Sequence, residues 1–344
     1  MQDKNEFPVP RQDDKPLWDV WMSSFHYPAI QVALEKGIFE ELNQAPLTTA
    51  ETAEKLGYSY RSMEAMLGLL TSLNFLTKHE GKHYLSPVAQ TYLQKDSPFY
   101  WGGILNYRTD GHTRELIREM LEKEKNNTPG TEINESWEQG KMDPEKAERF
   151  TEAMHSTSAA PAEGLSQRLD LKGHYLLLDV AGGSGSFAMA IASKNTQMRA
   201  TVFELPEVAP YTDKFIKKLK FESQVSVKGG NMFNADHWPR DYDTHFYSNI
   251  FHDWDEKTCR WLAEQSFTTL KKGGKIILNE MMLSDNADSN PTALAFSFKM
   301  LISMKGKQYR FAELKSFLED AGFINISTFP SFGYFSAIIG EKPK

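Results

Sequence analysis

The stretch LLLDVAGGSGSFAMAIASK, residues 176–194, decides the fold of the second half of the chain. It opens with the apolar residues of a short buried strand, passes through a glycine-rich loop and ends in small and apolar residues typical of a helix. Asp179 stands near the end of the strand, and Gly182, Gly183 and Gly185 lie in the loop. Glycines at this place let the backbone approach a ligand at the amino end of a helix. The stretch therefore predicts a strand–loop–helix unit with a ligand at the loop.

The chain beyond this unit continues to alternate strands with helices. Further short apolar runs are RATVFEL (199–205), VSVKGG (225–230), DTHFYSNI (243–250) and KIILNEMML (275–283). Strict alternation is typical of a parallel sheet covered by helices on both faces. The last two runs, INISTFP and YFSAIIGEK, are joined only by SFG, so they are expected to form an antiparallel pair. We expect an α/β domain over residues 171–344.

The first 100 residues carry a different pattern. Helical spacing runs through 27–42, TTAETAEKLG has Thr48 or Thr49 as N-cap and Gly57 as stop, a third helix covers 58–74, and a hairpin turns at Glu80-Gly81. Helices followed by a hairpin form a winged-helix pattern. We expect a winged-helix-like domain over residues 1–100 and a helical connector over 101–170.

A winged helix often binds DNA, but the charges here argue against it. Arg61 is the only basic residue of the helix that would read DNA, and Glu64 offsets its charge. The whole chain has a formal net charge of −7 and a pI near 5.8, whereas nucleic-acid and anionic-membrane binders need a basic face. The apolar faces of these helices are expected to pack against a second copy of the chain, which predicts a homodimer. A winged-helix regulator with a sensor domain is the rival from another class.

Composition places the chain inside the cell. It has 344 residues and a single cysteine, Cys259, so no intrachain disulfide can form and nothing indicates an oxidising compartment. The first 16 residues are charged and lack the apolar core of a signal peptide. No apolar run approaches the roughly 20 residues of a membrane span. We expect a cytoplasmic protein that binds neither membranes nor nucleic acid.

The glycine loop is compatible with two cofactors. Gly183, Gly185 and Ala188 fit the G-x-G-x-x-A pattern of NAD sites, and Glu204, at the end of the next strand, could hold a ribose under either hypothesis. Asp179 favours S-adenosylmethionine, because a carboxylate repels a pyrophosphate but suits an ammonium or sulfonium group. The run VKGGNMFN, which ends the third strand with an amide beside apolar side chains, suits an adenine.

The stretch FYSNIFHDWDEKT, residues 246–258, starts as an apolar strand and ends in a histidine and an acidic cluster. Open α/β sheets bind ligands at the carboxyl ends of their strands. His252 at such an end, beside the glycine loop, is expected to be a general base, because the unperturbed pKa of a histidine side chain, about 6.5, suits the deprotonation of a phenol. Asp253 could support it, whereas Asp255 and Glu256 suit the first turn of the next helix. No histidine, cysteine or acid cluster has metal-ligand spacing, so no metal is expected.

As a set, LDVAGGSGSFA, FELPEV, GGNMF, FHDWDE, LKKGGKIILNE and GKQYRFAELKSFLEDAGF resemble the S-adenosylmethionine-dependent O-methyltransferases of the plant caffeate, hydroxyindole and bacterial antibiotic type. The likeness covers nearly the whole chain. It implies a Rossmann-like seven-stranded sheet with an antiparallel last strand, a winged-helix-like dimerisation domain, and S-adenosylmethionine as methyl donor to the hydroxyl of a small aromatic or polyketide-like molecule.

The resemblance also implies roles for individual residues. The catalytic residues would be His252 as base, Asp253 after it and Glu280 as the acid that orients the histidine. The cofactor would be held by Ser158, Asp179, Gly182, Gly183, Gly185, Glu204, Leu205, Gly230, Asn231, Met232, Phe233 and Ser248. The substrate would be lined by Phe150, Met154, Met300, Met304 and Tyr309.

The chain departs from the family pattern at three of these positions. Asn231 replaces an acid on the adenine side, Ser248 stands where a cofactor contact is usual, and Tyr309 is the nearest match to a second acid beside the histidine. A base with one acidic partner leaves open methylation of carbon or nitrogen. It also leaves open a reaction in which the charged sulfonium assists a rearrangement without methyl transfer.

Overall fold

The structure is a computed structural model that describes all residues except 1–7, 98–99, 103–104, 106–110, 126–131 and 287–289. The chain forms two compact units. The sheet unit comprises the described residues of 1–15, 132–282 and 309–344, and the helical unit those of 16–131 and 283–308. This division differs from the three consecutive segments expected from the sequence. The connector is shared between the units. The segment 283–308 belongs to the helical unit because its helix α14 (Pro291–Ser303) packs on α5 (Tyr60–Ser72) and α8 (Gly111–Lys125).

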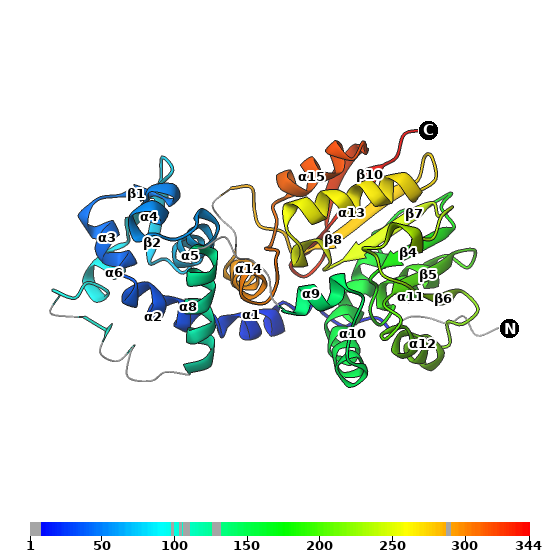
Figure 1. The fold of residues 1–344 in the computed structure, drawn as a ribbon, viewed down its shortest axis with the longest axis horizontal. Coiled ribbons are helices and arrows are strands. Elements are labelled where there is room, and N and C mark those ends of the chain that lie inside the picture. The colour runs from blue at the N-terminus through cyan, green and yellow to red at the C-terminus, as the bar shows by residue number, and fades with distance from the viewer. Residues whose placement is uncertain (1–7, 98–99, 103–104, 106–110, 126–131, 287–289) are drawn as a thin grey trace. The chain divides into compact units, whose positions relative to one another are not determined.

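The sheet unit is built on a seven-stranded sheet of order β6-β5-β4-β7-β8-β10-β9 (Figure 1). The strands are β4 (Leu176–Val180), β5 (Arg199–Glu204), β6 (Val225–Gly229), β7 (Thr244–Ser248), β8 (Lys275–Glu280), β9 (Ile324–Phe332) and β10 (Phe335–Glu341). Neighbouring strands pair in parallel along β6-β5-β4-β7-β8, whereas β10 runs antiparallel to both β8 and β9. The expected seven-stranded sheet with an antiparallel last strand is confirmed.

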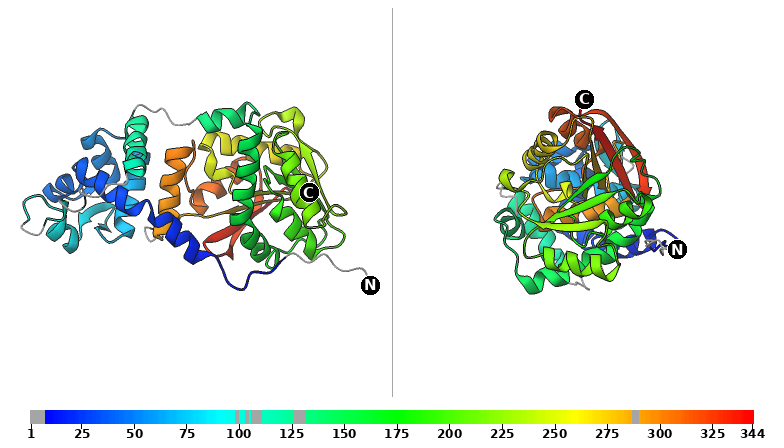
Figure 2. Two further views of the ribbon diagram at one scale, coloured as in Figure 1. Left: turned by 90° about the horizontal axis from the view of Figure 1, so that it is seen from below. Right: turned by 90° about the vertical axis from the view of Figure 1, so that its right-hand side faces the viewer.

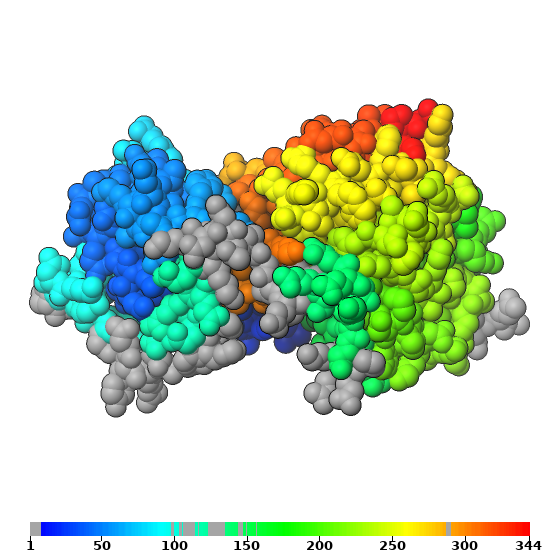
Figure 3. All heavy atoms as spheres, in the orientation of Figure 1, coloured from blue at the N-terminus to red at the C-terminus, as the bar shows by residue number. Residues whose placement is uncertain are grey.

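Helices cover both faces of this sheet. Its helices are α9 (Glu132–Glu138), α10 (Pro144–Ser166), α11 (Ser186–Lys194), α12 (Ala209–Lys218), α13 (Glu256–Thr269) and α15 (Phe311–Asp320), with short 3-10 helices η1 (Ala235–His237) and η2 (Phe251–Asp253). One buried core joins α10, α11 and α12 to the sheet, and a second joins α13 and α15 to the opposite face. In the right-hand view of Figure 2 the green helices lie below the strands and the orange-red α15 lies above them. The atoms of α13 and α15, yellow and orange, adjoin at the surface of this unit in Figure 3.

The helical unit contains the winged-helix pattern. Its elements are α1 (Lys15–Ser23), α2 (His26–Glu35), α3 (Ile38–Gln44), β1 (Leu47–Thr48), α4 (Thr49–Leu56), α5 (Tyr60–Ser72), β2 (Leu76–His79), β3 (Lys82–Leu85), α6 (Pro87–Tyr92), α8 (Gly111–Lys125) and α14 (Pro291–Ser303). Thr48 caps α4 in a capping box with Glu51, and Gly57 ends it in a left-handed conformation, as expected. The stretch 27–42 is two helices, because Gly37 interrupts it with φ of 71°.

The three-stranded sheet β1-β3-β2 forms the wing, and its hairpin turns at Glu80 and Gly81 as the sequence predicts. Among the described residues, no helix combines the length and the apolar character needed to cross a membrane.

Candidate active site

The glycine loop follows β4 and is held from beneath by Asp179. This carboxylate is 1% exposed and accepts the backbone N–H of Ala188, in the first turn of α11, at 3.3 Å. A Cβ at Gly182 would come within 2.5 Å of the carboxylate, so only glycine fits above it. Burial raises the pKa of Asp179 to about 8, against the effect of the Ala188 hydrogen bond. From the sequence we expect the Asp179 carboxylate to face an approaching ligand. The structure places it under the loop, which it fixes to α11.

Glu204, at the end of β5, holds the same loop from its side. Its Oε2 accepts the N–H of Gly183 at 2.9 Å, and its Oε1 accepts the N–H of Leu205 at 2.7 Å. Burial raises the pKa of Glu204. Gly183 has φ of 56°, and a Cβ there would meet no atom within 4 Å, so this side of the loop is open. Gly185 is also left-handed and packs on Val202. An open loop beside a carboxylate that can accept a ribose diol fits S-adenosylmethionine.

The end of β6 lies next to Glu204, because the N–H of Gly230 donates to the carbonyl of Glu204 at 2.8 Å. Asn231 follows, but its amide is already used within the protein: Nδ2 donates to the carbonyl of Glu138 at 2.9 Å, and Oδ1 accepts the N–H of Phe233 at 2.9 Å. An adenine contact by Asn231 stays a prediction. The residue fastens α9 to the loop after β6.

Met232 and Phe233 stay candidates for the apolar walls of an adenine pocket. Both are half-buried beside the core under α13. The Phe233 ring meets Trp254 edge-to-face at 4.5 Å between ring centroids, which leads directly from the β6 loop to the turn that carries His252.

His252 lies in η2, after the carboxyl end of β7, and is buried with 4% exposure. Two carboxylates flank the imidazole: Oε2 of Glu280 is 3.3 Å from Nδ1, and Oδ1 of Asp253 is 3.4 Å from Nε2. Glu280 ends β8, the neighbour of β7 in the sheet. The structure therefore brings together the three residues that the sequence singled out as catalytic. It also gives the histidine two acidic neighbours, one of them Asp253.

Glu280 also contacts the backbone of the turn that carries the histidine. Its Oε1 accepts the backbone N–H groups of Ile250 and Phe251, each at 3.0 Å. Burial raises the pKa of Glu280 to about 8, the charge of Asp253 adds to the rise, and the amide hydrogen bonds oppose it. Such a perturbed acid beside a histidine at a strand end is typical of active sites.

The acids after Trp254 begin the next helix. Asp255 is the N-cap of α13, and its side chain accepts the N–H of Thr258 at 2.9 Å; Glu256 lies in the first turn. This matches the structural role expected for both. Tyr309 is 3% exposed and donates its hydroxyl to the carbonyl of Trp254 at 2.8 Å. Its place beside the His252 turn is therefore clear, whereas its contact with substrate stays a prediction.

Other expected ligand contacts lie on α10 and at the strand ends. Phe150, Met154 and Ser158 are half-buried on α10. Ser248, the last residue of β7, accepts a hydrogen bond from Asn279 at 3.1 Å. Met300 and Met304 belong to the helical unit, where Met300 lies buried on α14 and Met304 ends that helix. Their contact with a substrate, like that of Phe150, Met154, Ser158 and Ser248 with ligands, stays a prediction.

Sequence reasoning missed two groups of residues near the site. Trp137 on α9 contacts both Phe150, at 5.6 Å, and Trp254, at 6.4 Å between ring centroids, and so extends an aromatic cluster to the His252 turn. His155 on α10 places Nδ1 2.8 Å from Oγ of Ser186, at the amino end of α11. The Trp137–Trp254 and His155–Ser186 contacts join segments distant in sequence, so no local pattern could have indicated them.

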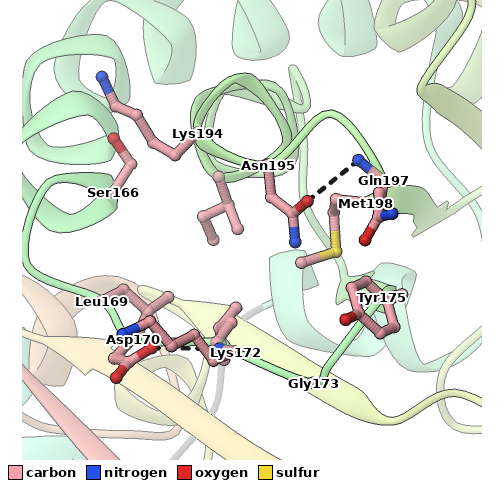
Figure 4. A pocket seen from close by; sticks show the side chains of 12 residues that line it. Ser166, Leu169, Asp170, Lys172, Gly173, Tyr175, Lys194, Asn195, Gln197 and Met198 are labelled. Carbon is pink, nitrogen blue, oxygen red and sulfur yellow. Dashed lines mark hydrogen bonds between the residues drawn. The ribbon is translucent and has the colours of Figure 1, made fainter.

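A hollow of about 380 Å³ lies at the opposite edge of the sheet (Figure 4). It is lined by the end of α10 and the segments that lead into β4 and β5, including Lys172 and Lys194. Because the strands point away from it, the hollow is separate from the glycine loop. Within the described ranges, no group of three or more His, Cys, Asp or Glu side chains is arranged to hold a metal ion.

Comparison with known proteins agrees with this architecture. An O-methyltransferase domain matches residues 114–324, and an O-methyltransferase dimerisation domain matches residues 20–95. The 3-hydroxy-5-methyl-1-naphthoate 3-O-methyltransferase of Streptomyces sahachiroi is 28% identical over 91% of each chain.

Two solved structures share the fold. An O-methyltransferase family 2 protein of Planctomyces limnophilus, in complex with apigenin, has a TM-score of 0.85 at 23% identity over 98% of each chain. Human N-acetylserotonin methyltransferase, in complex with S-adenosylmethionine, has a TM-score of 0.59 at 23% identity over 98% of this chain and 100% of that one. The domain match covers more than half of the chain and includes the glycine loop, the His252 turn and Glu280. The chain therefore belongs to the O-methyltransferase family of S-adenosylmethionine-dependent enzymes.

Proposed function

We propose that the protein transfers a methyl group from S-adenosylmethionine to the hydroxyl of a small aromatic or polyketide-like molecule, with His252 as general base. The observation that carries this proposal is the position of His252. It lies at the carboxyl end of β7, between Glu280 at 3.3 Å and Asp253 at 3.4 Å. β7 adjoins β4, whose end carries the glycine loop. A base beside a cofactor loop is the arrangement that an in-line displacement needs.

The bound cofactor would supply an electrophilic methyl group on a sulfonium. The chain would supply the proton acceptor. A phenol has a pKa of about 10 and is mostly un-ionised at neutral pH, so Nε2 or Nδ1 of His252 would take its proton as the oxygen attacks. The Asp253 carboxylate, 3.4 Å from Nε2, would then stabilise the imidazolium, because an opposite charge at this distance favours the charged ring.

Residues around the glycine loop would hold the cofactor. Glu204 would accept hydrogen bonds from the ribose, and the loop at Gly183, where a side chain would fill open space, would let the ligand approach the backbone. Met232 and Phe233 would flank the adenine. Asp179 would act from beneath, by fixing the loop to α11.

The aromatic cluster supports a flat acceptor. Trp137, Phe150, Phe233 and Trp254 form a continuous set of ring contacts that reaches the His252 turn. The relative named above acts on a hydroxynaphthoate, which agrees with such walls. A phenol would offer the base an acidic hydroxyl and the rings a planar surface.

The experiment is a methyl-transfer assay with isotopically labelled S-adenosylmethionine and a panel of phenols, naphthols and flavonoids, with products identified by mass spectrometry. Label on the oxygen of an aromatic product supports the proposal. Label on carbon or nitrogen, or a rearranged product without label, would replace it with one of the alternatives that the sequence left open.

A homodimer is part of this proposal. The dimerisation domain matches residues 20–95, and α1 exposes an apolar face: Leu17 is 75% exposed, Val20 73% and Trp21 39%. Exposed apolar faces of this kind mark interfaces, and a second copy of the chain is the partner that a dimerisation domain needs.

A further inference from the structure

The turn that carries His252 is held by buried side chains from three separate elements. On its amide side, Glu280 of β8 accepts the N–H groups of Ile250 and Phe251 at 3.0 Å each. The base is therefore oriented not only through its ring but also through the backbone that leads to it.

The carbonyl side of the turn has its own donors. The Sγ of Cys259, one helical turn into α13, lies 3.1 Å from the carbonyl of Phe251 and 3.5 Å from that of Trp254, and its thiol donates to these carbonyls. The hydroxyl of Tyr309, just before α15, donates to the carbonyl of Trp254 at 2.8 Å. Both side chains are buried, with exposures of 0% for Cys259 and 3% for Tyr309. Burial raises the pKa of the Cys259 thiol well above its usual value, so it stays a donor.

These carbonyl contacts lie on both sides of the base along the sequence. Phe251 and Trp254 are the residues directly before and after the pair His252-Asp253. The turn is a single short 3-10 helix without a side-chain N-cap, and such a short helix has little stability of its own. Hydrogen bonds from α13 and from the segment before α15 would hold the carbonyls of Phe251 and Trp254 in place. They would therefore keep the turn from rotating and the imidazole from moving away from the acceptor hydroxyl.

We propose that Tyr309 and Cys259 are positioning residues for His252, which hold the turn by its carbonyl groups while Glu280 holds it by its amide groups. This inference rests on the proposed role of His252 as base. It also gives Tyr309 a role other than that of the second acid it replaces: Tyr309 acts on the backbone beside the histidine, not on the imidazole.

The physical reason is geometric. Proton transfer requires the base within about 3 Å of the hydroxyl, and a displacement of about 1 Å can cost about a hundredfold in rate. Loss of one of several hydrogen bonds would shift the turn only in part. We therefore expect a loss of about tenfold in kcat from removal of the Tyr309 hydroxyl, and a smaller one from Cys259, because a thiol is a weak donor.

The test begins with Tyr309→Phe, which removes the hydroxyl and keeps the ring. Tyr247→Phe is the matched control: Tyr247 is also buried in this unit and its ring packs on Phe251, but its hydroxyl bonds to Ser266 of α13 and not to a carbonyl of the turn. We expect kcat to fall about tenfold in Tyr309→Phe only, with the Kd for S-adenosylhomocysteine within about twofold of wild type. Equal losses in the two variants would show a general effect of a lost buried hydrogen bond and overturn the inference.

Cys259 provides a second, independent comparison. Cys259→Ser keeps a donor at this position, whereas Cys259→Ala removes it. We expect the serine variant to retain more turnover than the alanine variant at equal thermal stability. The reverse order, or no difference between them, would remove Cys259 from the assignment even if Tyr309→Phe fails to fold.

The decisive readout is the combination with His252→Ala. If Tyr309 acts through the histidine, Tyr309→Phe should cause no further loss of turnover once the imidazole is gone. A further tenfold loss in that background would overturn this inference alone and leave the base assignment intact. Wild-type turnover of His252→Ala itself would overturn the base assignment, and this inference with it.

Discussion

Replacement of Glu280 by glutamine should change how the stability of the protein depends on pH. Glu280 is 2% exposed, and burial raises its pKa from 4.5 to about 8. The folded protein thus holds this proton more tightly than the unfolded chain. The resulting contribution to stability is fully present below pH 4.5 and is lost as pH rises through about 8. Glutamine cannot ionise, so Glu280→Gln should lose this part of the pH dependence.

The size of the effect follows from the shift. The difference 8 − 4.5 is 3.5 pKa units, and one unit corresponds to about 1.4 kcal/mol, which sets an upper value of about 5 kcal/mol. Most of this contribution to the free energy of unfolding is lost between about pH 5 and pH 8.5. Relaxation of a buried site reduces such values, so we expect wild type to lose about 2–4 kcal/mol more than Glu280→Gln over this range.

The assay is urea unfolding of wild type and Glu280→Gln, followed by tryptophan fluorescence at several values between about pH 5 and pH 8.5. The variant should be less stable relative to wild type at the acid end and gain on it toward the alkaline end. Turnover should fall less than in His252→Ala, because glutamine still accepts the turn amides. Parallel pH curves for the two proteins would refute the reasoning, since they would show that the Glu280 proton is held equally in the folded and unfolded states.

Further predictions concern the loop, the interface and metals. His155→Ala should weaken S-adenosylhomocysteine binding about five- to tenfold in calorimetry, because it removes the hydrogen bond that ties the first residue of α11 to α10. Ser186→Ala should not add to the loss, and strictly additive losses would contradict the link. The double variant Leu17→Glu, Val20→Glu should sediment as a monomer. The control Ile324→Glu, at a site 46% exposed in the sheet unit, should sediment as a dimer. A double variant that stays dimeric would show that α1 is not part of the interface. Turnover should survive EDTA, and a loss that magnesium restores would place the enzyme in a metal-dependent class.

The features predictable from the sequence are those that a few neighbouring residues determine. The glycine loop after LLLDV, the capping box at Thr48, the antiparallel link at SFG and the helix start at Asp255 all depend on local spacing, and the structure has each of them. The pairing of His252 with Glu280 is implied by the family resemblance, and the structure brings the two together because they lie at the carboxyl ends of the neighbouring parallel strands β7 and β8.

The features that the sequence did not reveal depend on contacts between distant segments. The amide of Asn231 is taken by the carbonyl of Glu138, 93 residues away. Asp179 is directed under the loop because the helix that follows turns its Ala188 N–H toward it. The division into units also depends on tertiary packing, since α14 follows β8 in the sequence but belongs to the helical unit, where it packs on α5. No periodicity or residue type predicts which of these partners an amide, an acid or a helix will find.

The role of His252 as general base is tested most directly by the turnover of wild type and His252→Ala from about pH 6 to pH 10, with S-adenosylhomocysteine affinity measured separately. We expect an unchanged affinity, because Glu204 and the glycine loop would hold the cofactor, and a loss of turnover of about 10²–10⁴ at neutral pH. That loss should shrink as pH approaches the pKa of the phenol, about 10, because an ionised acceptor needs no base. Wild-type turnover of His252→Ala at neutral pH would show that His252 is not the base, and an equal loss at every pH would show that it positions the acceptor without taking its proton.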